Sequence, residues 1–151
     1  MKKQKRVVID GVWPQLNNGE FYIKRVVNYT VHVGADVLVD GHDVIAAALL
    51  FKHEHSKTWD ELRMFTHHSN YYEATFEVKK QGTYSYKVVG WVDYALNWQH
   101  GISRKIEDSQ HVNSELLEGI YFLKKCMLKA NATEKKYLKE LLGLFRRTFH
   151  R

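Results

Sequence analysis

The first part of the chain alternates apolar and polar positions in the way a β-strand does. In the segment YTVHVGADVLVD, the apolar side chains that would share one face are Val31, Val33, Ala35, Val37 and Val39. Three further runs are rich in aromatic and β-branched residues, and the turn-like segments THHSN and KKQG lie between them: WDELRMF, YYEATFEV and TYSYKVVGWV. The spacing of these runs, from Val7 to about Val92, predicts a small antiparallel β-sandwich.

One unbroken apolar run, VIAAALLF from Val44 to Phe51, fits either a buried strand or a buried helix. It is short for a helix, and the turn-forming sequence DGHD comes directly before it. Both features favour a buried strand.

After Asp93 the apolar residues recur at helical spacing. Asn113 or Ser114 is placed to cap a first long helix, and Glu115 suits the positive end of its dipole. The apolar stripe of this helix consists of Leu116, Ile120, Leu123 and Met127.

A second long helix is predicted to begin at Thr133, with an apolar stripe at Leu138, Leu141, Leu142, Phe145 and Phe149. The connection KANAT is short, so the two helices should form an antiparallel hairpin. A weaker pattern predicts another helix from about Tyr94 to Asp108. Strands followed by helices predict an α+β fold, with a β-sandwich in residues 1–93 and a helical part in residues 94–151.

Composition narrows the class of protein. A chain of 151 residues with 44% hydrophobic and 26% charged residues and a single proline is typical of a folded globular domain. The net charge of +6 is concentrated at the two ends of the chain, which favours solvated termini over a nucleic-acid surface. No apolar segment is long enough to span a bilayer, and the start lacks the apolar core of a signal peptide. We therefore expect neither nucleic acid nor a membrane as a partner.

The single cysteine, Cys126, has no partner for a disulfide within the chain. It falls inside the first long helical pattern, beside Met127, and we expect it to be a buried free thiol. A free thiol indicates a reducing compartment, so we expect a cytoplasmic location.

The nine histidines raise the question of a metal site. His53 and His55 would project to one face of a strand, but no further ligand stands at the spacing of a closed zinc site. His67 and His68 are adjacent in a turn-like segment and would diverge. Exposed histidines are the simpler interpretation, and we expect no metal and no cofactor.

The segment DGHD places Asp40, His42 and Asp43 around Gly41. Two carboxylates could perform acid/base chemistry if their environments separated their pKa values, and the same residues could bind a metal. They also suit a turn, because Asp bonds downstream amides and Gly adopts positive φ. Composition favours the turn.

The four tryptophans are candidate carbohydrate contacts, because exposed aromatic rings on a β-sandwich can stack on sugar rings. They are Trp13, Trp59, Trp91 and Trp98. Core packing is the competing interpretation, since each indole could bury a large apolar area. Residue chemistry alone leaves both open.

Several sequence segments are more characteristic of a particular family than their composition alone would be. They are RVVIDGVWPQLNNGEFYIKRVV, ADVLVDGHDVIAAALLFK, GTYSYKVVGWVDYALNW and ELLEG. In this order, from Arg6 to Gly119, the chain resembles the N-terminal region of bacterial α-1,4-glucan:maltose-1-phosphate maltosyltransferases, of the α-amylase superfamily. The resemblance implies an immunoglobulin-like β-sandwich with a helical insertion, which we expect to be incomplete here.

The resemblance also implies where the chemistry is. Family members carry their catalytic residues in a separate (β/α)₈ barrel and transfer maltosyl units to an α-1,4-glucan as homodimers. No residue of this chain matches their catalytic motifs, so we assign none as catalytic. We expect a non-catalytic accessory and dimerisation domain whose partner is its own barrel, or alternatively a module that binds α-glucan through exposed aromatics.

Two features depart from the family pattern. Asn18, Glu20 and Tyr22 stand where relatives tend to carry aspartate, arginine and proline, which leaves a substrate-facing role of this loop open. Family members also return from the helices to the sandwich, and this chain stops before that return. We therefore expect an exposed strand edge or apolar groove.

Overall fold

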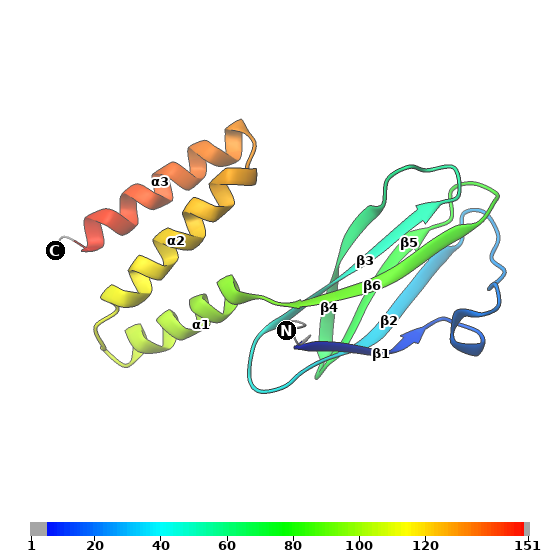
Figure 1. Cartoon of the computed structure of the whole chain (residues 1–151), viewed down its shortest axis with the longest axis horizontal. Helices are drawn as coiled ribbons and strands as arrows, with labels where there is room; N and C mark the ends of the chain where they lie inside the picture. Colours follow the sequence, from blue (N-terminus) through cyan, green and yellow to red (C-terminus); the bar gives the residue numbers. More distant parts are fainter. Residues whose placement is uncertain (1–5, 150–151) are drawn as a thin grey trace, which may run out of the picture. The chain divides into compact units, whose positions relative to one another are not determined.

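The computed structural model describes residues 6–149, except the side chains of His67, Arg146, Thr148 and Phe149. The basic residues Lys2, Lys3, Lys5 and Arg151, which the sequence places in its charged ends, lie outside the described residues. The chain divides into two compact units, one up to Asp93 and one from Tyr94 onward (Figure 1). None of the described helices is long and apolar enough to cross a membrane.

The first unit contains the strands and the second contains the helices (Figure 1). The strands are β1 (Val7–Trp13), β2 (Thr30–Val39), β3 (Ile45–His53), β4 (Asp60–His68), β5 (Tyr71–Glu77) and β6 (Tyr84–Val92), and a short 3-10 turn spans Asn17–Gly19. The helices are α1 (Tyr94–Glu107), α2 (Asn113–Lys129) and α3 (Ala132–Phe149). The predicted α+β fold, a β-sandwich followed by a small helical bundle, is confirmed.

The six strands are hydrogen-bonded in the order β1-β2-β5-β4-β3-β6, and every pair is antiparallel. β4 pairs with β3 through residues 60–64 and with β5 through residues 65–68, so it joins the layer of β1, β2 and β5 to the layer of β3 and β6. The end strands approach each other at Val7, whose Cγ1 atom lies 3.0 Å from the position that a Cβ atom on Gly90 would occupy. The sandwich is therefore nearly closed at this end.

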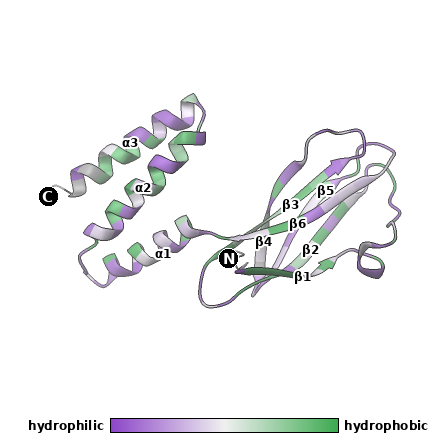
Figure 2. Ribbon diagram, viewed as in Figure 1, coloured by the Kyte–Doolittle hydropathy of each residue, from purple (hydrophilic) through white to green (hydrophobic). Residues whose placement is uncertain are grey.

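The core lies between the layers and is built from alternate residues of β2 and β3. On β2 it takes Val31, Val33 and Val37, and on β3 it takes Ala47 and Leu49. Figure 2 shows hydrophobic colouring along stretches of β1, β2 and β3. The expected strand over the run VIAAALLF is confirmed by β3, in which Ala46 to Leu49 are at most 1% exposed.

The helical unit is held together around Trp98 of α1. Its ring lies 5.9 Å from Phe145 of α3 and 6.3 Å from Phe122 of α2, measured between centroids. Gly119 of α2 faces Trp98 and Phe145, and an added Cβ atom there would lie 2.4 Å and 2.8 Å from their rings. Glycine is thus required at the centre of this unit for steric reasons.

The predicted starts of both long helices need correction. Val112 precedes α2 without a side-chain cap bond, so neither Asn113 nor Ser114 caps it. The α3 helix begins at Ala132 and not at Thr133, and its cap is Asn131: the Asn131 Oδ1 atom accepts the Glu134 N–H at 2.9 Å, and Glu134 Oε2 accepts the Asn131 N–H. This reciprocal pair is a capping box.

The expected burial of Cys126 is also wrong, because its side chain is exposed. The predicted stripe of α2 does face the unit's interior, with Leu116 buried and Ile120, Leu123 and Met127 half-buried. Cys126 falls beside that stripe, where no other helix covers it.

Candidate functional site

Residues 14–25 form an irregular lobe between β1 and β2. The segment reverses direction through Asn17, Asn18 and Gly19, which all have positive φ. The Gly19 and Phe21 amides donate to the Leu16 carbonyl at 3.0 Å and 3.4 Å. Asn and Gly are the residues that most readily adopt this backbone conformation, so the sequence NNG determines where the lobe turns.

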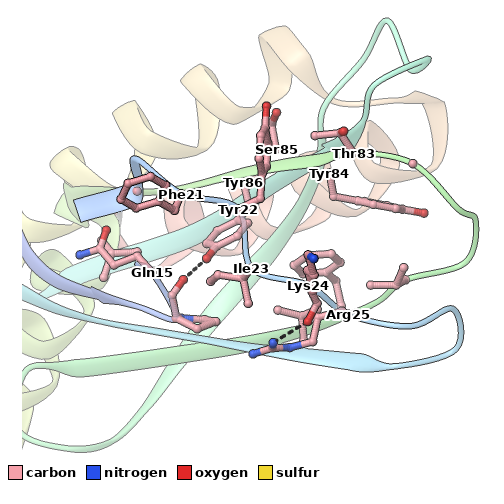
Figure 3. Close-up of a pocket in the computed structure, with 17 residues that line it drawn as sticks. Gln15, Phe21, Tyr22, Ile23, Lys24, Arg25, Thr83, Tyr84, Ser85 and Tyr86 are labelled. Atoms are coloured by element: carbon pink, nitrogen blue, oxygen red, sulfur yellow. Dashed lines mark hydrogen bonds between the residues drawn. The ribbon is translucent and has the colours of Figure 1, made fainter. Parts of the chain in front are cut away.

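A cavity of about 650 Å³ lies between this lobe and the start of β6 (Figure 3). Core residues Val31, Phe76 and Val78 line it together with Tyr84 and Tyr86 of β6. The Tyr86 hydroxyl donates to the Pro14 carbonyl and ties the lobe to the strand. Buried core residues therefore form part of the wall of this cavity.

The lining of this cavity carries positive charge. Lys24 and Arg25 line it, and its described lining residues include no Asp or Glu. The Arg25 guanidinium lies 5.2 Å from the centroid of the Tyr29 ring, and one of its N–H groups donates to the Lys24 carbonyl. Burial raises the pKa of Tyr86, and the nearby Arg25 offsets part of this effect.

Titration with alkali is expected to ionise Tyr72 and Tyr86 at a higher pH than an ordinary tyrosine. Burial raises the pKa of each phenol above its ordinary value of 10.0, and the nearby Arg63 and Arg25 respectively lower it again only in part. Because each folded-state pKa exceeds the unfolded one, their contribution to stability is complete below about pH 10 and is lost as pH rises through the folded-state pKa.

The tyrosinate absorbance of the native and the denatured chain, measured against pH, tests this expectation. Tyr86→Phe and Tyr72→Phe should each remove part of the absorbance increase that the native chain shows at the highest pH. Identical titration curves for the native and denatured chains would contradict it.

A second, shallower cavity of about 540 Å³ lies on the lobe. The segments 13–16 and 22–25 line it. Trp13 is 56% exposed and Tyr22 is 81% exposed, so both rings are available to a ligand. Gln15 and Lys24 supply polar groups at the same place.

The other tryptophans lie in different surroundings. The Trp59 ring has the ammonium groups of Lys52 and Lys87 at 5.0 Å and 4.6 Å from its centroid. The Trp91 ring has the Arg63 guanidinium at 5.1 Å. The Trp98 indole N–H donates to the Glu115 carbonyl at 2.6 Å inside the helical unit. Each of these three tryptophans thus has its own local partners, which differ from the lining of the cavity beside Trp13.

The DGHD segment is the connection between β2 and β3. Gly41 has a φ of 97°, Asp40 and His42 are exposed, and Asp43 forms an ion pair with Arg6. This pair also supplies a partner for the otherwise buried Asp43 Oδ2 atom. The arrangement is that of a turn anchored to the strand β1.

The histidine pair takes part in local bonding. The His53 Nε2 atom lies 3.0 Å from the Gln81 carbonyl, and its Nδ1 atom accepts the His55 amide at 3.3 Å. Both ring nitrogens of His53 are thus occupied. Among the described residues, no group of three or more His, Cys, Asp or Glu side chains is placed to hold a metal ion.

Sequence reasoning singled out Trp13 but did not connect it with Gln15 or Lys24, and it treated Tyr22 only as a departure from a pattern. The signal that could have joined them is the NNG sequence, which predicts a reversal. A reversal at that point brings the residues before it back beside those after it.

Comparisons with known proteins now identify the chain. Residues 5–150 match the family described as α-1,4-glucan:maltose-1-phosphate maltosyltransferase, domain N/S. Relatives with the name α-1,4-glucan:maltose-1-phosphate maltosyltransferase include one from Methylacidiphilum infernorum, 34% identical over 81% of this chain and 18% of the relative. Another, from Chlorobaculum tepidum, is 33% identical over 93% of this chain and 21% of the relative. A third, from Salinibacter ruber, is 36% identical over 81% of this chain and 19% of the relative.

The fold and these matches define the class of this chain: it is a domain of the kind found in larger glycosyltransferases. The chain belongs to the α-1,4-glucan:maltose-1-phosphate maltosyltransferase family and corresponds to its domain N/S. It spans only 18–21% of the length of the relatives named above.

Proposed function

We propose that this chain is a non-catalytic accessory domain of an α-glucan maltosyltransferase that works in the cytoplasm. Its function would be to assemble a homodimeric enzyme and to hold a separate catalytic (β/α)₈ barrel in place. The observation that carries the proposal is the match of residues 5–150 to domain N/S, together with the small share of each relative that the chain covers.

The helical unit supports a role in assembly. Leu117, Tyr121 and Leu128 of α2 are exposed and stand at spacings that place them along one side of the helix. Leu128 is 83% exposed. Tyr137 and Leu144 of α3 are exposed as well. Exposed apolar residues gathered on a helix pair are typical of a protein–protein contact.

The sandwich supports the same role at β6. Among the described residues this end strand has β3 as its one hydrogen-bonded neighbour, and Val7 of β1 approaches its other edge at Gly90 without pairing with it. The cavity that Tyr84 and Tyr86 line lies at the opposite end of β6, next to the core. A free edge with apolar residues beside it favours pairing with a further segment of polypeptide.

The isolated chain is expected to associate with itself and to release no phosphate from maltose 1-phosphate in the presence of glycogen. Light scattering over a range of concentrations measures the first property, and a phosphate assay measures the second. Leu117→Gln combined with Leu128→Gln should reduce association, because both side chains are exposed and apolar. Lys129→Gln, a polar exchange on the same helix, is the matched control. A strict monomer at every concentration, or measurable turnover, would contradict the proposal.

A second candidate function is binding of α-glucan. One observation favours it: the exposed rings of Trp13 and Tyr22 line a single cavity on the lobe. Rings that face solvent beside polar groups are typical of sites that hold a ligand in place.

A further inference from the structure

The outward face of the layer formed by β1, β2 and β5 is acidic. On β2 the residues between the core positions point outward, and Asp36 is one of them. The strand register places Asp10 of β1 opposite Asp36 and Glu73 of β5 opposite Gly34, so both carboxylates also point outward. None of these three strands contains a Lys or an Arg residue. This surface, the acidic face, thus has no strand cation to balance its carboxylates.

Two carboxylates of the acidic face lie directly across from each other. Asp10 and Asp36 are cross-strand partners and both are exposed. Like charges in this arrangement repel and destabilise a sheet. No described Lys, Arg or His residue forms an ion pair with either of them. A cationic partner from outside the chain would remove this repulsion.

The outward face of the opposite layer is basic. Lys52 of β3, Lys87 of β6 and Arg63 of β4 alternate with core positions of their strands and point outward. Arg63 also pairs with Asp93 at 3.3 Å. Glu61 is the one carboxylate among the described outward residues of these three strands. This surface, the basic face, therefore carries an excess of positive charge.

Aromatic rings hold the side chains of the basic face in place. The ammonium groups of Lys52 and Lys87 both lie near the Trp59 ring, and the Arg63 guanidinium lies near the Trp91 ring. No described carboxylate forms an ion pair with Lys52 or Lys87. A side chain that is already held loses less freedom on binding, and Trp and Arg are the residues that contribute most to protein–protein contacts.

The acidic face carries exposed aromatic rings as well. Phe65 of β4, which is the cross-strand partner of Glu73, is 66% exposed. Tyr71 lies over Gly34, since a Cβ atom on Gly34 would lie 1.9 Å from the Tyr71 hydroxyl oxygen. Trp13 of β1 is paired with the same glycine and is exposed too. Each face thus combines aromatic rings with charge of one sign.

We propose that the acidic face of one copy of this chain binds the basic face of a second copy. The outward faces of the two layers of a sandwich point in opposite directions, so each copy presents both surfaces at once. The contact is heterologous, so copies can join in an open series. It goes beyond the assembly role proposed above, which uses α2 and α3, and does not depend on it.

Sedimentation velocity of the 151-residue chain with Leu117→Gln and Leu128→Gln measures this contact apart from the helical one. The unmodified chain is measured alongside. We expect self-association at low salt, with species larger than a dimer. Raising NaCl from about 20 mM to about 300 mM should weaken it by about tenfold, because exposed charges are screened. Association that does not change with salt would overturn a contact made by these charges.

Charge reversal tests each face separately. Lys52→Glu with Lys87→Glu reverses the basic face, and Asp10→Lys with Asp36→Lys reverses the acidic face. Each double variant alone should associate at least about tenfold more weakly, since faces of like charge then meet. An equimolar mixture of the two should associate again, because the unaltered acidic face of the first variant meets the unaltered basic face of the second.

A matched control changes the charge elsewhere. Lys135→Glu with Lys136→Glu makes the same change of net charge on α3 and should leave the association unchanged. A similar loss in this control would show that net charge and not these faces governs association. Loss in both face variants without recovery in the mixture would overturn their pairing. A monomer at low salt in the Leu117→Gln, Leu128→Gln background would overturn the second copy as the partner, and association of the unmodified chain would still support the helical contact.

Discussion

Replacing Leu49 with alanine is expected to lower the free energy of unfolding of the sandwich by about 2–5 kcal/mol. Leu49 is 0% exposed and is one of the largest fully buried side chains of the chain. It lies at the centre of β3, where Leu62 of β4 and Val88 of β6 are its cross-strand partners. Removing its side chain would leave a cavity between two layers that the strands on both sides hold apart.

Urea denaturation followed by circular dichroism measures this loss. Leu38→Ala is the matched control, because Leu38 is 39% exposed on β2 and loses the same atoms. Its expected effect is within about 0.5 kcal/mol of zero. Equal losses for the two variants would show that β3 is not the centre of the core.

The exchange Gly119→Val is expected to destabilise the helical unit by about 1–3 kcal/mol. A Cβ atom at this position would lie 2.4 Å from Trp98 and 2.8 Å from Phe145, closer than carbon atoms can approach. The rings would have to separate, and the Trp98 bond to Glu115 would be strained. Thermal unfolding and the Trp98 indole resonance measure the effect.

Gly101 supplies the control for this exchange. It lies within α1, and an added Cβ atom there meets no other atom within 4 Å. Gly101→Ala should therefore stabilise the unit by about 0.5–1 kcal/mol, because glycine is the poorer helix former. A loss of stability from Gly101→Ala as large as that from Gly119→Val would contradict the steric explanation.

The fold could be predicted well from the sequence because local periodicity and burial agree. The alternating residues of β2 face the core, and the short run after DGHD is the buried strand β3. Helix ends were harder to predict from the sequence, because several polar residues near each start could serve as caps. At α3 the spacing of Asn131 and Glu134 carries the decisive signal, because a capping box requires both residues.

The candidate site could be predicted only in part. Exposed tryptophans could be listed from composition, but their separation in space depends on which strands pair. The cations over the Trp59 and Trp91 rings come from other strands, and no periodicity encodes these contacts. The pairing of Trp13 with Tyr22 depends on a non-repetitive reversal at Asn17, Asn18 and Gly19. Irregular segments of this kind leave no periodic pattern to read.

The approach of Val7 to Gly90 has a consequence for how the molecule folds. β1 can meet β6 only after every intervening strand is in place, so closing the sandwich requires contacts between residues far apart in the sequence. Such contacts form slowly, because a long loop must be closed before they contribute. The α2–α3 pair needs only the short connection at Ala130 and Asn131. The helical unit should therefore acquire its structure earlier than the sandwich, and the strand edges should remain open to wrong pairing for longer than any helix.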